Sequence, residues 1–257
     1  MTSSKRFPRA IVGIFLIGCL PVLAQVTETP QTVAPGKLLF EIDGIKLSFD
    51  RAGPAGNKHT AVAVASTLVS TGLTSTVDLQ AGFELFLRKT FEGGGLRDSR
   101  TGFGDLFFRT KWKFWQDETA GAALALIPYV KIPSNTDNVG NDAIEGGLIV
   151  PWEKVVGALK AGAMFRWDVI RNPNDDGYDA RWQLSGFVQR NLTKSFGVYA
   201  ESTFAAYSSG WNDWQGTVGV GALWWITGWL QLDYELQRGI NDNATDWAHV
   251  LRVNWGW

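Results

Sequence analysis

Cysteine and histidine are nearly missing from this 257-residue chain, which has one cysteine, Cys19, and two histidines, His59 and His249. Cys19 lies in an apolar N-terminal stretch, so the rest of the chain can form no disulfide and offers no thiolate nucleophile or ligand. The two histidines stand far apart and give no metal-ligand spacing. We therefore expect no metal site and no cofactor, and we assign no catalytic residue.

Long apolar runs are also missing after residue 24, where none approaches the ~18 to 20 residues that a membrane helix needs. Charged residues make up only 19% of the chain, whereas it has 13 tryptophans and 29 glycines. This mixture is unusual for a protein with water on all sides. The sequence thus excludes helical membrane spans and at the same time indicates an apolar environment.

Residues 1–24 are typical of a secretory signal peptide, with basic residues Lys5, Arg6 and Arg9, an apolar stretch over residues 10–20 and a small-residue cleavage site ending at Ala24. Lipidation of Cys19 is the alternative form of processing. Removing three of the 24 Lys and Arg leaves the 25 Asp and Glu in excess, so nucleic acid is not an expected partner. Residues 25–36 then form a short periplasmic N-terminal segment, followed by a single domain over residues 37–257.

Apolar and polar residues alternate along segments of about ten residues, a pattern typical of membrane strands. Between residues 76 and 87, one face carries Val77, Leu79, Ala81, Phe83, Leu85 and Leu87, and the other carries Asp78, Gln80, Gly82 and Glu84. Similar segments recur along the chain. They predict an all-β, up-and-down antiparallel transmembrane β-barrel of about twelve strands, near 38–50, 58–70, 75–88, 103–115, 120–132, 143–152, 157–169, 179–190, 196–206, 215–225, 229–239 and 247–257.

The connections between these segments alternate in length, as the periplasmic turns and extracellular loops of outer-membrane barrels do. The short ones are Gly72–Thr74, Gln116–Thr119, Glu153–Val156, Asn191–Ser195 and Ile226–Gly228. The long ones are Arg51–Asn57, Lys89–Thr101, Ser134–Asp142, Ile170–Tyr178, Tyr207–Trp214 and Ile240–Asp246. Both chain ends then lie in the periplasm, and we expect the protein in the outer membrane of a Gram-negative bacterium.

Tryptophans cluster at the ends of the predicted strands, as in the aromatic girdles of membrane barrels. Those near the periplasmic side are Trp115, Trp152, Trp224, Trp225, Trp229, Trp255 and Trp257, and those near the outer side are Trp167, Trp182 and Trp247. The last strand ends in Trp257, with Leu251, Val253 and Trp255 on the same face, which resembles the C-terminal signature read by the barrel-assembly machinery. Outer-membrane lipid and that machinery are therefore expected partners.

Several segments together resemble an outer-membrane transporter family named for the meta-pathway of phenol degradation. They are Gly72-Leu73-Thr74, the stretch 102–106, the run 126–134, Glu201 within residues 198–201, residues 230–233, residues 238–241 and Asp246-Trp247. The resemblance covers most of the chain after residue 24. It implies a barrel that passes small, hydrophobic or aromatic molecules across the outer membrane, without implying any activity on phenol itself.

The inward face of the predicted barrel carries charges of both signs, which must pair or stay hydrated. We name ten lumen-lining candidates: Asp105, Arg109, Lys111, Lys131, Glu145, Arg166, Tyr199, Glu201, Asp233 and Glu235. They either line a narrow pore for small-molecule solutes or close the lumen as a structural network. Inward glycines, Gly82, Gly121, Gly147, Gly162, Gly219 and Gly221, make room for a solute or for facing aromatics such as Tyr129 and Tyr199.

Three other interpretations stay open at this stage. A lipid-modifying barrel enzyme would need a histidine base, and His249 falls on the lipid side near an outer strand end but has no serine two residues away. A closed structural barrel would use the inward charges only for stability. A soluble secreted barrel would be extracted from cells without detergent. We expect a passive, porin-like route and no enzyme.

Overall fold

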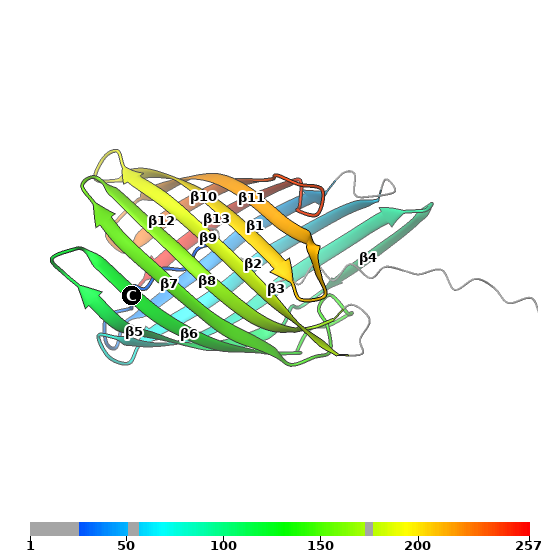
Figure 1. The fold of residues 1–257 in the computed structure, drawn as a ribbon, viewed down its shortest axis with the longest axis horizontal. Helices are drawn as coiled ribbons and strands as arrows, with labels where there is room; N and C mark the ends of the chain where they lie inside the picture. Colours follow the sequence, from blue (N-terminus) through cyan, green and yellow to red (C-terminus); the bar gives the residue numbers. More distant parts are fainter. Residues whose placement is uncertain (1–25, 51–56, 173–176) are drawn as a thin grey trace, which may run out of the picture.

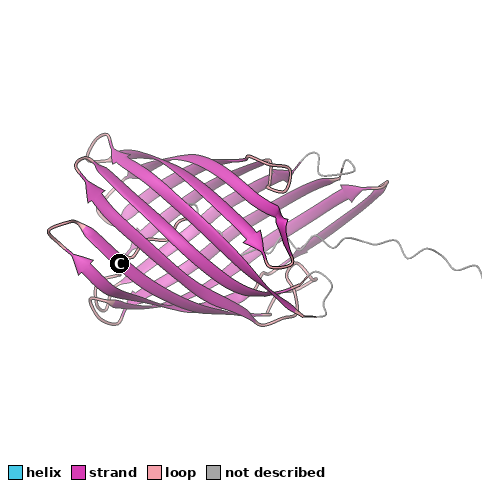
Figure 2. Ribbon diagram, in the orientation of Figure 1, coloured by secondary structure: helices cyan, strands magenta, loops and turns pink. Residues whose placement is uncertain are grey.

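The computed structural model describes residues 26–50, 57–172 and 177–257, so the predicted signal peptide, residues 1–24, lies outside the described residues. The described chain is all-β (Figure 2). Its strands are β1 (Leu38–Asp50), β2 (Lys58–Gly72), β3 (Val77–Gly93), β4 (Leu96–Gly102), β5 (Leu106–Asp117), β6 (Ala122–Ile132), β7 (Glu145–Val156), β8 (Leu159–Arg171), β9 (Tyr178–Asn191), β10 (Phe196–Tyr207), β11 (Gly210–Trp225), β12 (Leu230–Gly239) and β13 (Trp247–Gly256). Over those ranges, nothing forms a helix long and apolar enough to cross a membrane.

The strands form one closed antiparallel barrel in which each strand pairs with its neighbours along the chain (Figure 1). β1 closes it by pairing with both β2 and β13. β3 is the exception, because Leu87–Gly93 pair with β4 and Val77–Gly82 pair with β5. β4 and β5 are therefore one return strand interrupted at residues 103–105, and the barrel has the twelve strands that the sequence predicts.

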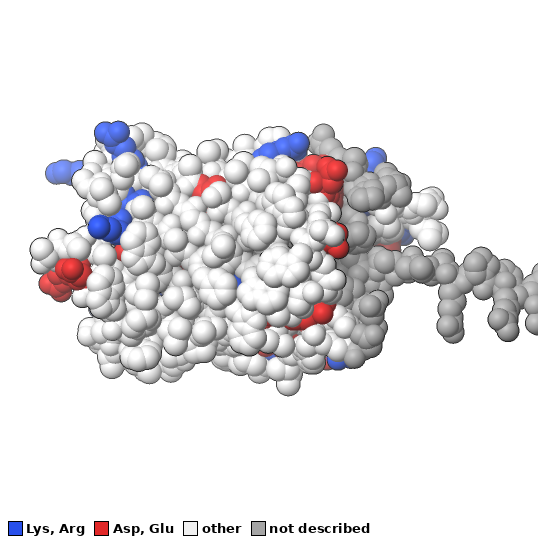
Figure 3. Space-filling model, in the orientation of Figure 1, with Lys and Arg blue, Asp and Glu red and all other residues white. Residues whose placement is uncertain are grey.

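The alternation along the strands becomes an apolar outside and a polar inside. In β8, Phe165 and Trp167 are exposed on the outer surface, whereas Arg166 and Asp168 are buried. In the space-filling view, Lys, Arg, Asp and Glu gather mainly toward the two ends of the barrel, and the surface between them is largely uncharged (Figure 3). Such an uncharged band matches the hydrocarbon layer of a membrane. The backbone matches it as well, because the strands of a closed barrel leave no edge with unpaired hydrogen-bonding groups.

The predicted alternation is wrong at one residue, Leu87, which the pattern places on the lipid face. The structure buries it at 1% exposure, while Leu85 and Phe86 are both exposed. The pairing of β2 with β3 keeps one register but lacks a pair between Val64–Phe86 and Ser66–Glu84, where Ala65 has φ of 54°. At this irregularity the inward and outward faces exchange by one residue, so that Leu85 and Phe86 are both exposed and Leu87 turns inward.

Three predicted connections are also corrected. Most of Lys89–Thr101 is not a loop but a hairpin arm of β3 and β4 that projects past the end of the barrel (Figure 1). Tyr207–Trp214 contracts to residues 208–209 because β11 begins at Gly210. Glu153–Val156 belongs to β7, and the chain turns at Gly157, whose φ of 60° suits a two-residue hairpin.

The two ends of the barrel differ. The short-turn end has the connections after β2, β5, β7, β9 and β11, together with the C terminus (Figure 1). The long-loop end has the β3–β4 arm and residues 133–144, the connection between β6 and β7. Backbone hydrogen bonds between Leu38 and Trp257, at 2.8 and 2.9 Å, hold the barrel closed at the short-turn end.

Candidate functional site

All ten lumen-lining candidates lie inside the barrel. Nine are buried and Asp105 is partly buried. Asp105 directly precedes β5, which carries Arg109 and Lys111, and the others stand on β6 (Lys131), β7 (Glu145), β8 (Arg166), β10 (Tyr199 and Glu201) and β12 (Asp233 and Glu235). The structure brings eight of them into three separate groups, whereas Arg109 and Lys111 pair with Glu28 of the N-terminal segment.

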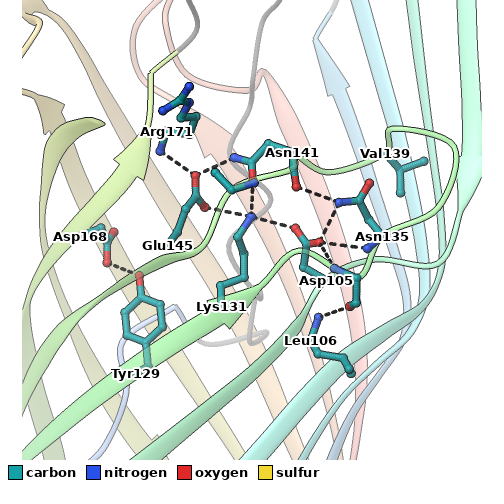
Figure 4. Close-up of polar contacts among 12 residues, drawn as sticks. Asp105, Leu106, Tyr129, Lys131, Asn135, Val139, Asn141, Glu145, Asp168 and Arg171 are labelled. Carbon is teal, nitrogen blue, oxygen red and sulfur yellow. Dashed lines mark hydrogen bonds and ion pairs between the residues drawn. The ribbon is translucent and has the colours of Figure 1, made fainter. Parts of the chain in front are cut away.

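The first group holds residues 133–144 against the barrel wall. The carboxylate of Asp105 accepts hydrogen bonds from the backbone nitrogens of Ser134 and Asn135, at 3.1 and 3.2 Å, and from the Asn135 side chain at 2.8 Å. The Ser134 hydroxyl accepts a bond from the Leu106 nitrogen at 2.8 Å. Figure 4 shows these contacts converging on Asp105 from the start of the loop. Asp105 therefore holds this loop against the start of β5 through hydrogen bonds, and we call this contact the Asp105 clasp.

Lys131 lies at the centre of the same group, between two carboxylates (Figure 4). Its ammonium group is 2.8 Å from Asp105, 3.0 Å from Glu145 and 2.6 Å from the side-chain oxygen of Asn141. Asn141 in turn donates to Glu145 at 2.6 Å, and Glu145 accepts from the Arg171 backbone nitrogen. One lysine thus connects both ends of the loop, and its charge is compensated by the buried Glu145 and the partly buried Asp105.

The middle of residues 133–144 folds inward rather than outward. Val139 is only 1% exposed and packs with Ala63 of β2 and Leu87 of β3. Lys89 donates to the Val139 carbonyl oxygen. Since β2 and β3 are separated from β6 by β5 in the sheet, the loop reaches over part of the barrel mouth. It narrows the lumen at the long-loop end.

The second group is an aromatic and ionic cluster on β6, β8 and β9. Asp168 receives hydrogen bonds from Tyr129 (2.5 Å), Arg166 (2.7 Å) and Arg181 (3.0 Å). The Arg166 guanidinium also lies over the Tyr129 ring, 4.9 Å from its centre. All of these residues face the interior, so the cluster fills lumen space with a hydrogen-bonded ionic network, in which the Arg181 Nε is the one buried atom of these described side chains without a partner.

Glycines opposite aromatic rings make this filling possible. A side chain added at Gly147 would meet Tyr129, and one added at Gly221 would collide with the Tyr199 ring. The same holds for two further pairs, Gly82 with Phe107 and Gly162 with Phe187. The prediction that inward glycines accommodate facing aromatics is confirmed for Tyr129 and Tyr199. Gly121 is a correction: it lies in a turn with φ of 59°, not on the inward face of a strand.

Sequence reasoning missed the main occupant of the lumen, which is the N-terminal segment, residues 26–36. The backbone nitrogens of Val26 and Thr27 donate to the Glu201 carboxylate on β10 at 2.9 and 2.6 Å. The Thr27 hydroxyl donates to Ser185 on β9 at 2.7 Å. Thr27 is 1% exposed. The segment therefore begins deep inside the barrel, against the β9–β10 wall.

Glu28 then contacts the opposite wall. Its carboxylate lies 2.6 Å from Arg109 and 3.9 Å from Lys111, both on β5. Arg109 also donates to Gln80 on β3 at 2.6 Å, and the Glu28 nitrogen points at the sulfur of Met164 on β8. Glu28 is thus the ion-pair partner of two buried cations of β5.

The charge environment of Glu28 favours its ionised form. Burial raises the pKa of the Glu28 carboxyl, but the positive charges of Arg109 and Lys111, with a hydrogen bond from Arg109, outweigh burial and hold the pKa below its usual value. The segment therefore binds the wall as a carboxylate.

The rest of the segment descends to the short-turn end. Gln31 accepts a bond from Lys111 through its carbonyl oxygen at 3.1 Å and donates to Glu153 of β7 at 3.1 Å. The Val33 nitrogen donates to both carboxylate oxygens of Asp78 on β3, each at 3.1 Å. The segment leaves the lumen beside Gly72, where any side chain would collide with the Val33 carbonyl oxygen.

The third group lies on β10 and β12, where the segment begins. The Tyr199 hydroxyl donates to Asp233 at 3.0 Å, next to Glu201 on the same strand. Glu235 is fully buried, and neither of its carboxylate oxygens has a hydrogen-bond partner among the described residues. Its carboxylate lies over Gly219, which leaves the room for it. This part of the wall has an excess of negative charge.

Beyond the acidic group, Arg252 of β13 pairs with Asp43 of β1 at 2.7 Å, and both are buried. A cavity of about 810 Å³ opens between this pair and the N-terminal segment. It lies toward the short-turn end and is lined by Glu28, Glu41, Lys111, Arg252, Trp229 and Trp257, among others. Within the described ranges, no group of three His, Cys, Asp or Glu is arranged to hold a metal ion.

Comparisons with known proteins agree with the barrel. A family model described as "Putative MetA-pathway of phenol degradation" matches residues 24–256. The NanC porin structure superimposes with a TM-score of 0.55 at 11% identity, covering 84% of this chain and 98% of that one. The translocator domain of autotransporter NalP from Neisseria meningitidis also gives 0.55 at 11% identity, covering 88% and 89%. At such identities the structures show a shared fold. No curated protein matches the chain in sequence.

Proposed function

Because this chain belongs to the family described by the MetA pathway of phenol degradation, we propose that it is an outer-membrane barrel through which small molecules diffuse, and that its own N-terminal segment closes it. The proposal takes the mature chain to begin after Ala24 and to span the membrane with its twelve strands. Small aromatic molecules are the solutes that the family description suggests.

The observation that carries the proposal is the chemistry of the contacts between the segment and the wall. They are hydrogen bonds and ion pairs, from Val26 and Thr27 to Glu201, from Glu28 to Arg109 and from Val33 to Asp78. When such polar contacts break, hydrogen bonds to water replace them, so the net cost in free energy is modest. Displacing a plug packed through a large apolar surface would cost more, because that surface would be exposed to water. The segment is therefore built to be displaced.

Two constrictions lie in series along the lumen. Residues 26–36 occupy its middle and its short-turn end, and residues 133–144 cover part of the long-loop end. The loop is held by Asp105 and Lys131, which also belong to the wall. A solute entering from the long-loop end meets a charged rim first and then the Arg109–Glu28 pair. This favours small solutes with a polar or ionised group, including aromatic acids.

The alternatives find less support. The lipid-modifying enzyme would use His249 as a base on the outer surface, but the ring of His249 contacts the Tyr234 hydroxyl at 2.9 Å. A tyrosine in that place supplies neither the serine nucleophile nor the orienting acid of such a site. A purely structural barrel would not need a cavity of about 810 Å³ beside the segment.

The test is single-channel conductance of the refolded mature chain in planar bilayers. We compare wild type with a variant lacking residues 26–33, and we use Glu118→Gln, in an exposed turn, as a control for handling. Wild type should give rare openings and the deletion variant a steady conductance that benzoate reduces more than phenol does. A correctly folded deletion variant that stays silent would contradict the proposal and favour a closed structural barrel.

A further inference from the structure

The hairpin arm of β3 and β4 continues the barrel wall past its long-loop end, together with the first residues of β2 (Figure 1). Leu87 and Lys89 of β3 point inward, where both contact Val139. Arg88 and Thr90, the alternate residues of the strand, therefore point outward. The arm thus has an outer face that looks away from the barrel axis.

This outer arm face is a regular array of side chains, because residues directly opposite each other in an antiparallel ladder share a face. From the barrel outward, the register gives three rows of three: Val62, Arg88 and Thr101; Thr60, Thr90 and Ser99; and Lys58, Glu92 and Arg97. The middle row consists of hydroxyl groups alone. Successive rows are about 7 Å apart, so the long cationic side chains on either side reach toward these hydroxyls.

The cations of the outer arm face are only weakly engaged by protein groups. Arg88 donates from Nε to the Ser99 hydroxyl at 3.3 Å, which uses one of the five N–H donors of a guanidinium. Arg97 lies 3.4 Å from Glu92, but both side chains are exposed, and an exposed pair contributes little. Lys58 is exposed as well. Three cations against one anion leave the face with a net charge of +2.

The outer arm face lies directly beside the apolar band of the barrel. Leu85 and Phe86 of β3 are exposed on the outer surface, and so is Val64, which pairs with Phe86. Basic residues at such a boundary stand at the level of lipid head groups. With the short turns in the periplasm, this level belongs to the outer leaflet. The lipid of that leaflet in a Gram-negative outer membrane is a glycolipid that carries phosphate groups.

We propose that the outer arm face binds the phosphate groups of this outer-leaflet glycolipid. Arg88 and Arg97 make the ionic contacts, because a guanidinium matches phosphate through two parallel N–H bonds. Lys58 adds charge, and the hydroxyls of the middle row add donors. The acyl chains of the same lipid then lie against Leu85 and Phe86. This interaction goes beyond the proposed transport and requires only that the long-loop end faces outward.

The experiment uses the mature chain refolded in detergent, so that it carries no lipid from the cell. Native mass spectrometry measures the dissociation constant of lipid A, first with its phosphate groups and then after removal of these groups by a phosphatase. Wild type should bind the phosphorylated form at least about tenfold more tightly, since each basic residue near an anionic head group contributes a factor of about five. Raising the salt concentration should reduce this preference.

The variants are Arg88→Gln and Arg97→Gln, each of which should weaken binding of phosphorylated lipid A about fivefold. The matched control is Arg100→Gln, which makes the same change of charge on the opposite face of the same hairpin, where Arg100 contacts Asp98 and the Asn138 carbonyl oxygen. It should bind as wild type does. Gel electrophoresis, in which folded and heat-denatured barrel migrate differently, establishes folding. If one variant fails to fold, Lys58→Gln takes its place with the same expected loss.

Equal affinity of wild type for the two forms of lipid A would overturn the inference. So would a loss in Arg100→Gln as large as that in Arg88→Gln, because the effect would then follow the net charge of the protein rather than this face. Inorganic phosphate is the third probe. If it displaces lipid A at equal concentration, the face binds free phosphate and the assignment to the glycolipid is wrong. None of these results depends on conductance.

Discussion

Glu28 is the residue through which the N-terminal segment should respond to pH. Its carboxylate faces Arg109 and Lys111 of β5, with Arg166 and Glu41 farther off, and its pKa is held below the usual glutamate value. A group with a lowered pKa in the docked state favours docking above its free pKa, near 4.3, and loses this contribution as the pH falls through the docked value. Docking should therefore weaken in acid.

We expect wild-type openings to become more frequent as the pH falls below about 4. Glu28→Gln should open often already at neutral pH, because Arg109 then lacks its buried partner. In that variant, the increase in opening frequency at low pH should be smaller than in wild type. Conductance recorded across a pH series checks both, and an unchanged pH profile in Glu28→Gln would show that another group controls opening.

Single glycines that face aromatic rings inside the barrel should affect its stability. Gly221→Ala places a methyl group against the Tyr199 ring and forces the ring away from Asp233. We expect it to lower the free energy of unfolding by about 1–3 kcal/mol, as overpacking does. Gly228→Ala, in a turn with open space around it, is the control and should change little. Urea unfolding followed by tryptophan fluorescence measures the difference; equal midpoints would disprove the contact.

At the scale of elements, the connection over residues 133–144 is the part of the long-loop end that enters the lumen. Its position depends on Asp105, which accepts three hydrogen bonds from Ser134 and Asn135 and pairs with Lys131. Val139 is the residue of this loop that packs in a cluster of buried apolar side chains of the described chain. Its inward fold is therefore set by a few polar contacts rather than by burial.

Asp105→Ala should release this loop without unfolding the barrel. We expect limited proteolysis to cut within residues 133–144 several-fold faster than in wild type, because local opening there costs less free energy. Asp142→Asn, an exposed carboxylate of the same loop, serves as the control. Lys131→Ala should act in the same direction. Equal cutting rates in Asp105→Ala and the control would mean that the clasp does not hold the loop.

At the scale of the whole molecule, the C-terminal strand both closes the barrel and carries the predicted assembly signal. Trp257 pairs with Leu38 through its backbone, while the residue as a whole is 75% exposed. The side chain therefore adds little to closure. A substitution of the Trp257 side chain can therefore test the assembly signal without changing the stability of the barrel.

Trp257→Ala should lower the amount of folded barrel in outer membranes several-fold, yet the variant refolded in detergent should keep the wild-type unfolding midpoint. Trp229→Ala, another exposed tryptophan at the short-turn end, is the control. The amount of folded barrel is measured in membrane fractions by gel electrophoresis, in which folded and heat-denatured barrel migrate differently. A Trp257→Ala variant that assembles as well as wild type would remove the assembly machinery from the expected partners.

The period of two along each segment, the absence of long apolar runs and the alternating connections determined the barrel, its twelve strands and which side chains face inward, because each is a local property of the chain. Leu87 escaped this logic, since the irregularity at Ala65 is a feature of pairing between strands. Which charges pair, the inward fold of residues 133–144 and the N-terminal segment in the lumen were decided only by tertiary structure. These contacts join residues as far apart in sequence as Val26 and Glu201, 175 positions, and Asp43 and Arg252, 209 positions. No local pattern records which distant walls a closed barrel brings face to face.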